Sequence, residues 1–334
     1  MKGKIETIVL IIIIAAMAAY LAFRPTDRAT YQLPELPGIA KETITKIEVT
    51  GPENSFTVQR KDAKWFIGPD NRLVDSSKID RILDIVSALK LTAMVSESKS
   101  DRLYDLNPEK RIQVNVWADK NLKRSFSIGK SAATFRHTFV KISGDDRVFH
   151  GEKNFRDRFE MTVDAMRDKN VLAFKPDEIK SFTITRDGQT TEFKKRYELN
   201  ADTASTKKAE NETSPSDKKP FTWVTASGEV ADLNKIDAFL FALSGLKCNR
   251  YLDDTARDTL THPVISITLS GTREYQMTVY PHGKKEEESP SWSAQSSENN
   301  SPFLLADFTA KDIIKTPGDL MPAKPKSEEA VKEE

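Results

Sequence analysis

The fold is decided by residues 64–91, "KWFIGPDNRLVDSSKIDRILDIVSALKL", because residues 222–248 repeat them as "TWVTASGEVADLNKIDAFLFALSGLKC". Both stretches place the string Asp-x-x-Lys-Ile-Asp after a tryptophan, which is Trp65 in the first copy and Trp223 in the second. Two such strings in the same register are hard to obtain by chance. The pattern therefore predicts that the chain contains a tandem duplication.

Each copy continues into an amphipathic helix. Apolar residues recur at steps of three and four, which places them on one helical face. These residues are Ile79, Ile82, Leu83, Val86 and Leu89 in the first copy, and Ile236, Phe239, Leu240, Leu243 and Leu246 in the second. Asp75 and Asp232 precede the two helices. A carboxylate there can accept a hydrogen bond from a free amide of the first turn, so both are predicted N-caps.

Period-two alternation predicts a β-hairpin before each helix and several strands after it. The predicted fold class is α+β, with two tandem β-β-α-β(n) repeats whose mainly antiparallel sheets are each covered by one amphipathic helix. The repeats are assigned to residues 39–174 and 175–320. Polar inserts are expected near 200–219 and 283–300. The charged tail, residues 321–334, has little to bury and is expected to be disordered.

The N-terminal region suggests a membrane anchor. Thr7–Phe23 carries no charge over 17 residues, just enough to cross a hydrocarbon core of ~30 Å at ~1.5 Å per residue. We therefore expect a cytoplasmic leader at 1–6, a single transmembrane helix at 7–23 in the inner membrane, and a Pro-containing tether at 24–38. The bulk of the chain is then periplasmic. A cleaved signal peptide and a cytoplasmic body are the alternatives.

The composition excludes several classes of function. The 51 basic residues are balanced by 50 acidic ones, so a nucleic-acid partner is not expected. Cys248, the single cysteine, allows no disulfide framework and is interpreted as a small buried apolar residue. The four histidines lack paired ligand spacing, so no metal is predicted. Gly129-Lys130-Ser131 lacks the earlier glycine of a phosphate loop, so neither a nucleotide nor another cofactor is expected.

The tryptophans are the candidate contact residues. Trp65 and Trp223 occupy matched positions on strands that face the helices, which favours core packing over a sugar-stacking platform. Trp292 lies in the polar stretch "SPSWSAQ" and is a candidate for partner contact. A chance aromatic residue in a loop is the alternative for Trp292.

The order "KIEV…W…KIDRIL…DLNP…FSIGK…FVKI…VFH…RDKNVLAF" resembles the bacterial domain of unknown function (DUF) family 4340. The matching positions are Trp65, Leu106-Asn107-Pro108, Ile128-Gly129 and Arg167-Asp168-Lys169 before Leu172 and Phe174. The resemblance implies an envelope protein with one N-terminal membrane segment. It also implies an accessory role beside ABC-type export or gliding components. It supplies no catalytic residue.

We therefore expect a membrane-anchored, non-enzymatic, extracytoplasmic interaction or scaffold protein whose partners are other envelope or transporter proteins. No catalytic, cofactor-binding or metal-binding residue is assigned. The alternative is an envelope hydrolase that acts on glycan or peptide through a carboxylate pair. With 50 acidic residues, some carboxylates come close to one another by chance.

Overall fold

The protein is described by a computed structural model. The described residues are 2–23, 31–97, 100–197, 220–282 and 291–323. The chain divides into two compact units, residues 1–163 and 164–334. This division lies N-terminal to the boundary predicted after residue 174.

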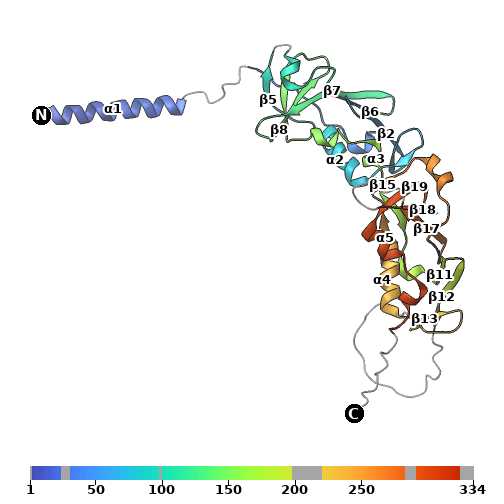
Figure 1. Cartoon of the computed structure of the whole chain (residues 1–334). Coiled ribbons are helices and arrows are strands. Elements are labelled where there is room, and N and C mark those ends of the chain that lie inside the picture. The colour runs from blue at the N-terminus through green and yellow to red at the C-terminus, as the bar shows by residue number, and fades with distance from the viewer. Residues whose placement is uncertain (1, 24–30, 98–99, 198–219, 283–290, 324–334) are drawn as a thin grey trace, which may run out of the picture. The chain divides into compact units, whose positions relative to one another are not determined.

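The first unit is built on one nine-stranded antiparallel sheet with the order β4-β3-β2-β1-β6-β7-β8-β9-β5. Figure 1 labels β2, β5, β6, β7 and β8 among its strands. Its strands are β1 (Lys46–Thr50), β2 (Ser55–Lys61), β3 (Lys64–Ile67), β4 (Arg72–Leu73), β5 (Leu91–Ser96), β6 (Ile112–Ala118), β7 (Asn121–Ser131), β8 (His137–Ile142) and β9 (Val148–Glu152). Its α-helices are α1 (Lys2–Phe23) and α2 (Ser76–Ser87), and its short 3-10 helices, labelled η, are η1 (Lys41–Thr43), η2 (Asp101–Tyr104) and η3 (Arg156–Arg158). Helix α2 buries its apolar face, which carries Ile79, Ile82, Leu83 and Val86.

The second unit contains an eight-stranded antiparallel sheet with the order β13-β12-β11-β16-β17-β18-β19-β15, and a small sheet in which β10 pairs with β14. Its strands are β10 (Asn170–Ala173), β11 (Ser181–Arg186), β12 (Gln189–Tyr197), β13 (Phe221–Thr225), β14 (Gly245–Lys247), β15 (Arg250–Tyr251), β16 (Ile265–Ser270), β17 (Glu274–His282), β18 (Ser291–Ser296) and β19 (Asn299–Ala306). Its helical elements are η4 (Pro176–Glu178), α4 (Leu233–Ser244), η5 (Asp254–Thr259), α5 (Asp307–Ile313) and η6 (Pro317–Leu320), and α3 (Val163–Met166) spans the unit boundary.

The two large sheets have the same internal connectivity. Each begins with a hairpin, continues into a covering helix, and adds its later strands in the same spatial order. The backbone carbonyl of the matched tryptophan makes the same hydrogen bond in both units. Trp65 O accepts a hydrogen bond from the Val74 amide at 2.9 Å, and Trp223 O accepts one from the Ala231 amide at 2.9 Å.

Both covering helices begin at the aspartates named above. The Asp75 carboxylate accepts hydrogen bonds from the amides of Ser77 and Lys78 at 2.9 and 3.2 Å. The Asp232 carboxylate accepts from the amides two and three residues after it, at 3.0 and 3.3 Å. An N-cap of this kind contributes about 1 kcal/mol to the free energy of unfolding.

The predicted α+β class is wrong, because strands dominate the described residues. The short alternating segments after each helix assemble into sheets of nine and eight strands. The helix that covers each sheet has only 12 residues. The molecule is therefore mainly a β protein with two large antiparallel sheets.

The predicted transmembrane helix at 7–23 is also not supported. Among the described residues, no helix has both the length and the apolar character that crossing a membrane requires. Helix α1 covers this segment.

The described part of the predicted tether is fastened to the first unit, because Arg147 Nη1 donates to Gln32 O at 3.2 Å and Arg124 Nη2 donates to Pro37 O. The backbone just after the tether is fastened as well. The Ile39 amide donates to Ser87 O at 2.9 Å, just as the Phe174 amide donates to Ser244 O at 3.3 Å in the second unit. In the second unit the residues before Phe174 form β10. In the first unit the corresponding residues, 35–38, form no strand. Pro37 lies among them and has no amide hydrogen for a ladder.

The predicted inserts and tail have different outcomes. The insert near 200–219 lies outside the described residues, as do residues 283–290 and 324–334. The remainder of the insert predicted near 283–300 belongs to β18 and β19, so that part of it is sheet.

Candidate functional site

The matched tryptophans lie in the cores of their units. Trp65 is 7% exposed and Trp223 is 1% exposed. The Trp223 ring also meets Phe182 edge-on, with ring centroids 5.3 Å apart. Neither ring offers an open face on which a sugar could stack.

Trp292 does not lie in a loop. It is a half-buried residue of β18 that packs against the core of the second unit. Its indole nitrogen donates to Asp307 Oδ1 at 3.0 Å. Since its ring and its polar atom are both engaged within the unit, Trp292 is better explained as a structural residue than as a free contact residue.

The segment Leu106-Asn107-Pro108 packs over β7 of the first sheet. Leu106 is fully buried, whereas Pro108 is exposed. Beneath this segment lies Gly129 of β7, where an added Cβ atom would be 2.1 Å from the carbonyl oxygen of Tyr104. Only glycine fits this close approach, which gives Gly129 a packing role in the first unit.

An acid-lined pocket of about 570 Å³ lies beside that segment. Four carboxylates line it, those of Glu53, Asp105, Glu109 and Glu160. Lys110 lies 3.2 Å from Asp105, and Arg156 lies 2.6 Å from Glu160. These two carboxylates are thus held in ion pairs.

The third carboxylate of this pocket, Glu109, has its pKa lowered, chiefly by a hydrogen bond from the Asn107 side chain. A general acid at neutral pH needs the opposite shift. The lowered pKa therefore does not suit Glu109 to the general-acid role of the hydrolase alternative.

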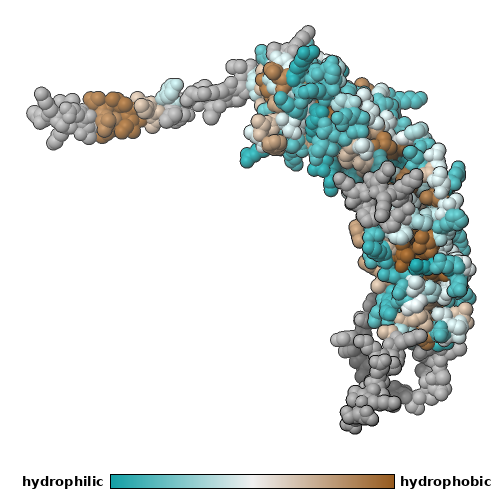
Figure 2. Space-filling model, viewed as in Figure 1, coloured by the Kyte–Doolittle hydropathy of each residue, from teal (hydrophilic) through white to brown (hydrophobic). Residues whose placement is uncertain are grey.

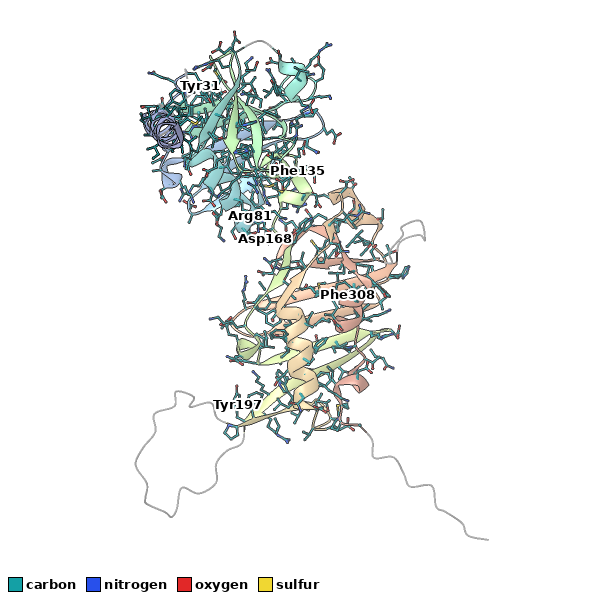
Figure 3. All side chains as sticks on the ribbon, turned by 90° about the vertical axis from the view of Figure 1, so that its left-hand side faces the viewer. Tyr31, Arg81, Phe135, Asp168, Tyr197 and Phe308 are labelled. Atoms are coloured by element: carbon teal, nitrogen blue, oxygen red, sulfur yellow. The ribbon has the colours of Figure 1, made fainter. Side chains whose placement is uncertain are left out.

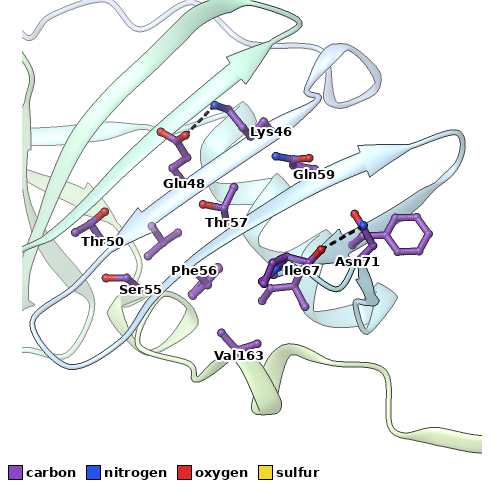
Figure 4. A pocket seen from close by; sticks show the side chains of 14 residues that line it. Lys46, Glu48, Thr50, Ser55, Phe56, Thr57, Gln59, Ile67, Asn71 and Val163 are labelled. Carbon is purple, nitrogen blue, oxygen red and sulfur yellow. Dashed lines mark hydrogen bonds and ion pairs between the residues drawn. The ribbon is translucent and has the colours of Figure 1, made fainter. Parts of the chain in front are cut away.

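A second hollow of about 590 Å³ lies along β1, β2 and β3 (Figure 4). Lys46 and Glu48 line it and are paired at 2.8 Å. The Glu48 carboxylate also accepts a hydrogen bond from the Trp117 indole at 3.3 Å. The hydrogen bond from Lys46 is the main cause that lowers the pKa of Glu48. This hollow thus contains a neutralised pair and no activated acid.

The triplet Arg167-Asp168-Lys169 fastens the start of the second unit to strands far along the chain. The Arg167 guanidinium is buried, lies 3.4 Å from the ring centroid of Tyr251, and donates to Ser301 Oγ at 3.3 Å. The Tyr251 hydroxyl donates to the Asp168 carbonyl oxygen at 2.7 Å. These contacts explain the triplet as a structural clamp; Figure 3 labels Asp168.

Cys248 lies next to this clamp and is 6% exposed. Burial raises the pKa of its thiol to about 11. A thiol with such a pKa is almost entirely protonated at neutral pH, and the thiolate is the nucleophilic form. Cys248 is thus the inert buried residue that the sequence indicates.

Two histidines meet although they lie apart in the sequence. His137 of β8 and His150 of β9 stack with ring centroids 5.0 Å apart. Burial, followed by the charge of His137, lowers the pKa of His150. Within the described ranges, no group of three or more His, Cys, Asp or Glu residues could hold a metal ion. Sequence spacing missed this pair because the pairing of β8 with β9 creates it.

The second unit also exposes two large aromatic side chains on neighbouring helices. Phe241 of α4 is 77% exposed and Phe308 of α5 is 74% exposed. Helices α4 and α5 contact each other, and Figure 3 shows Phe308 on α5 beside α4. We call the surface that carries Phe241 and Phe308 the α4–α5 face. Figure 2 shows a hydrophobic area on the visible side of this unit within a mostly hydrophilic surface.

The corresponding positions of the first unit are polar. Phe241 lies nine residues after its N-cap, and the residue nine positions after Asp75 is Asp84. The strand registers from β6 to β9 and from β16 to β19 match Glu152 to Ala306, and counting two residues further along each chain segment pairs Asn154 with Phe308. One fold thus carries two solvated polar residues in one unit and two exposed phenylalanines in the other.

Comparison with known proteins identifies the family. The family described as "Domain of unknown function (DUF4340)" matches residues 65–263, more than half of the chain. The chain belongs to the DUF4340 family. No curated protein and no solved structure matches it. The matched part of this DUF4340 protein includes residues of both units, the Gly129 close approach, and Arg167 and Tyr251 of the clamp, but not Ser301.

Proposed function

We propose that this DUF4340 protein is a non-enzymatic interaction protein whose second unit binds another protein through the α4–α5 face. The observation that carries the proposal is the exposure of Phe241 and Phe308 on two adjoining helices. Burying one phenylalanine side chain contributes ~1.5–3 kcal/mol. Two such residues are enough to form the centre of a binding surface.

The internal comparison separates this face from ordinary exposed residues. Singly exposed apolar side chains are common on soluble proteins and need no explanation. Here the matched positions of the first unit are Asp84 and Asn154, so the fold itself does not require an aromatic residue at either place. A partner surface in the second unit gives a physical reason for the difference.

The proposed partner is another envelope protein, such as a component found beside an ABC-type export transporter, and the proposed location is extracytoplasmic. The resemblance to envelope proteins of the DUF4340 family supports both. An alkaline phosphatase fused after Glu334, which is active only outside the cytoplasm, tests the location. We expect an active fusion. An inactive phosphatase fusion, together with an active cytoplasmic reporter at the same place, would contradict the location.

The interaction itself is tested by site-specific cross-linking. A photo-reactive phenylalanine analogue at position 241 should cross-link a defined partner in cells at native expression level. The double variant Phe241→Ser/Phe308→Ser should lose co-purification of that partner. The matched control is Phe135→Ser, since Phe135 is also 74% exposed but belongs to the first unit. Equal recovery of the partner by the double variant would refute the assignment to this face.

A further inference from the structure

The first unit contains a groove beside α2 that none of the interactions above uses. Its volume is about 360 Å³, which lies within the range of ~300–1,000 Å³ typical of small-molecule sites. Helix α2 and the turn after β9 form its walls, with the lining side chains Arg81, Ile85, Leu89, Lys153, Phe155 and Arg158 among others. Figure 3 labels Arg81 in the first unit.

The two acidic residues of the groove have cationic partners. Asp84 forms an ion pair and hydrogen bond with Lys41. Glu152 lies 3.8 Å from Lys90. The negative charge in the groove is thus neutralised by lysines of the same unit.

The basic residues of the groove are only partly neutralised. Arg158 is paired with Asp157 at 3.6 Å. Neither Arg81 nor Lys153 has an ion-pair partner among the described residues. The groove therefore has two positive charges in excess.

Lys153 lies in a turn that hydrogen bonds to a buried side chain hold in place. Its backbone has φ 72°, in the left-handed region that residues other than glycine seldom adopt. The fully buried Thr138 fixes this turn from both sides. Its hydroxyl donates to the Lys153 carbonyl oxygen at 3.1 Å and accepts the Phe155 amide at 3.0 Å. A residue kept in an unfavourable conformation by surrounding contacts is a reason to look for a function.

The C-terminal end of α2 borders the groove. A helix C-terminus carries a partial negative charge, which would ordinarily repel an anion. Two of the last carbonyl oxygens of α2 already accept hydrogen bonds. Arg124 Nη1 donates to Val86 O at 2.6 Å, and the Ile39 amide donates to Ser87 O at 2.9 Å. The buried Arg124 guanidinium also places a positive charge at this helix end.

The second unit lacks the same pair of charges. Ala238 lies six residues after its N-cap, at the position that corresponds to Arg81. Asp307 corresponds to Lys153 by count, because each follows directly after the matched strand ends Ala306 and Glu152. The two positive charges are thus a property of the first unit alone and are not required by the shared fold.

We propose that the groove of the first unit binds a small anion, a phosphate or carboxylate group on a short apolar stem. Arg81 can hold such a group through two parallel hydrogen bonds, and Lys153 contributes a second positive charge. Ile85, Leu89 and Phe155 provide the apolar wall for the stem. This ligand site is separate from the α4–α5 face, so each can fail without the other.

Isothermal titration calorimetry of the full chain tests the site with four probes: hexyl phosphate, hexanoate, inorganic phosphate and hexylamine. We expect binding of hexyl phosphate or hexanoate, at least tenfold weaker binding of inorganic phosphate because it lacks a stem, and no binding of hexylamine. The affinity for the anion should fall as the salt concentration rises. Binding of hexylamine as tight as that of the anions, or no binding of either stemmed anion, would overturn the proposal.

Variants locate the binding. Arg81→Gln and Lys153→Gln should each weaken binding of the stemmed anion at least fivefold, and the two together at least twentyfold. Lys120→Gln is the matched control, because Lys120 is exposed in the first unit and does not line the groove. Unchanged thermal unfolding of each variant shows that the fold is intact. A loss of affinity in Lys120→Gln equal to that in Arg81→Gln would refute the site.

Discussion

Replacing Gly129 by alanine tests whether the Leu106-Asn107-Pro108 segment closes the first unit. Gly129 lies in β7, directly beneath this segment. An added Cβ would be 2.1 Å from Tyr104 O, where 3.0 Å is the closest separation that real Cβ atoms show. The backbone at Tyr104 must therefore move by at least 0.9 Å, the difference between these two distances. Leu106 Cγ, at 3.0 Å, must move as well.

The energetic cost follows from what this segment covers. Leu106 packs with Ala132, Phe139 and Val148 in a small core of its own. Overpacking a close contact costs ~1–3 kcal/mol. Because the contact is with backbone and the segment must lift away from its core, we expect the upper end, about 3 kcal/mol. For a unit of this size that corresponds to a fall in Tm of about 10 °C.

Differential scanning calorimetry of the full chain, with hydrogen exchange read by mass spectrometry, measures the effect. The transition of the first unit should move while that of the second stays, and exchange should increase in β8 and in residues 101–108. The control is Gly245→Ala, because no atom lies within 4 Å of the added Cβ there and the backbone φ is −134°. A Tm for Gly129→Ala within 2 °C of the unchanged chain would refute the reasoning.

Three further predictions concern buried or capping groups. Asp75→Ala should lower the free energy of unfolding by about 1 kcal/mol at pH 7. Partial burial raises the pKa of Asp75, but hydrogen bonds led by that from Ser77 outweigh it and leave the pKa lowered. The difference between Asp75→Ala and the unchanged chain should therefore persist above pH ~4 and vanish as the pH falls through the folded pKa, which urea unfolding at pH 7 and pH 3 checks. Arg124→Ala removes the donor to Val86 O and should cost about 2 kcal/mol in urea unfolding; a cost below 0.5 kcal/mol would contradict this role. Cys248 should resist iodoacetamide at pH 8 until the chain is denatured, since a pKa of about 11 leaves about one thiol in a thousand ionised; alkylation of the native chain within minutes would contradict the burial.

The resemblance to the DUF4340 family could be recognised before the fold was known, but the class of the fold could not. Helix periodicity is a strong local signal, whereas each strand after the helices is short and says little about how many strands will join one sheet. Edge pairing of β5 with β9 and of β15 with β19 brings together residues more than 50 positions apart. Local patterns therefore predict too little β structure, and they predict a loop near residue 292 where the structure has β18.

The candidate sites depended on distant contacts even more strongly. The Arg167 side chain meets Ser301, 134 residues later, and no spacing rule connects the two. His137 and His150 become neighbours only through the pairing of β8 with β9. Phe241 falls outside the apolar face of α4, so its exposure follows from helix periodicity, but only the tertiary structure brings α5 with Phe308 against α4.

The sequence alone determined the two amphipathic helices, their aspartate caps, the hairpins before them and the matched tryptophans. Helical periodicity and capping involve residues at most a few positions apart, so both can be recognised from short stretches of sequence. The tertiary structure alone decided how many strands joined each sheet, which cations beside α2 have no ion-pair partner among the described residues, and that α4 and α5 bring Phe241 and Phe308 onto one surface. Each of these features depends on contacts between residues far apart in the sequence. Only the packing of a whole unit determines which side chains are buried or paired and which stay exposed.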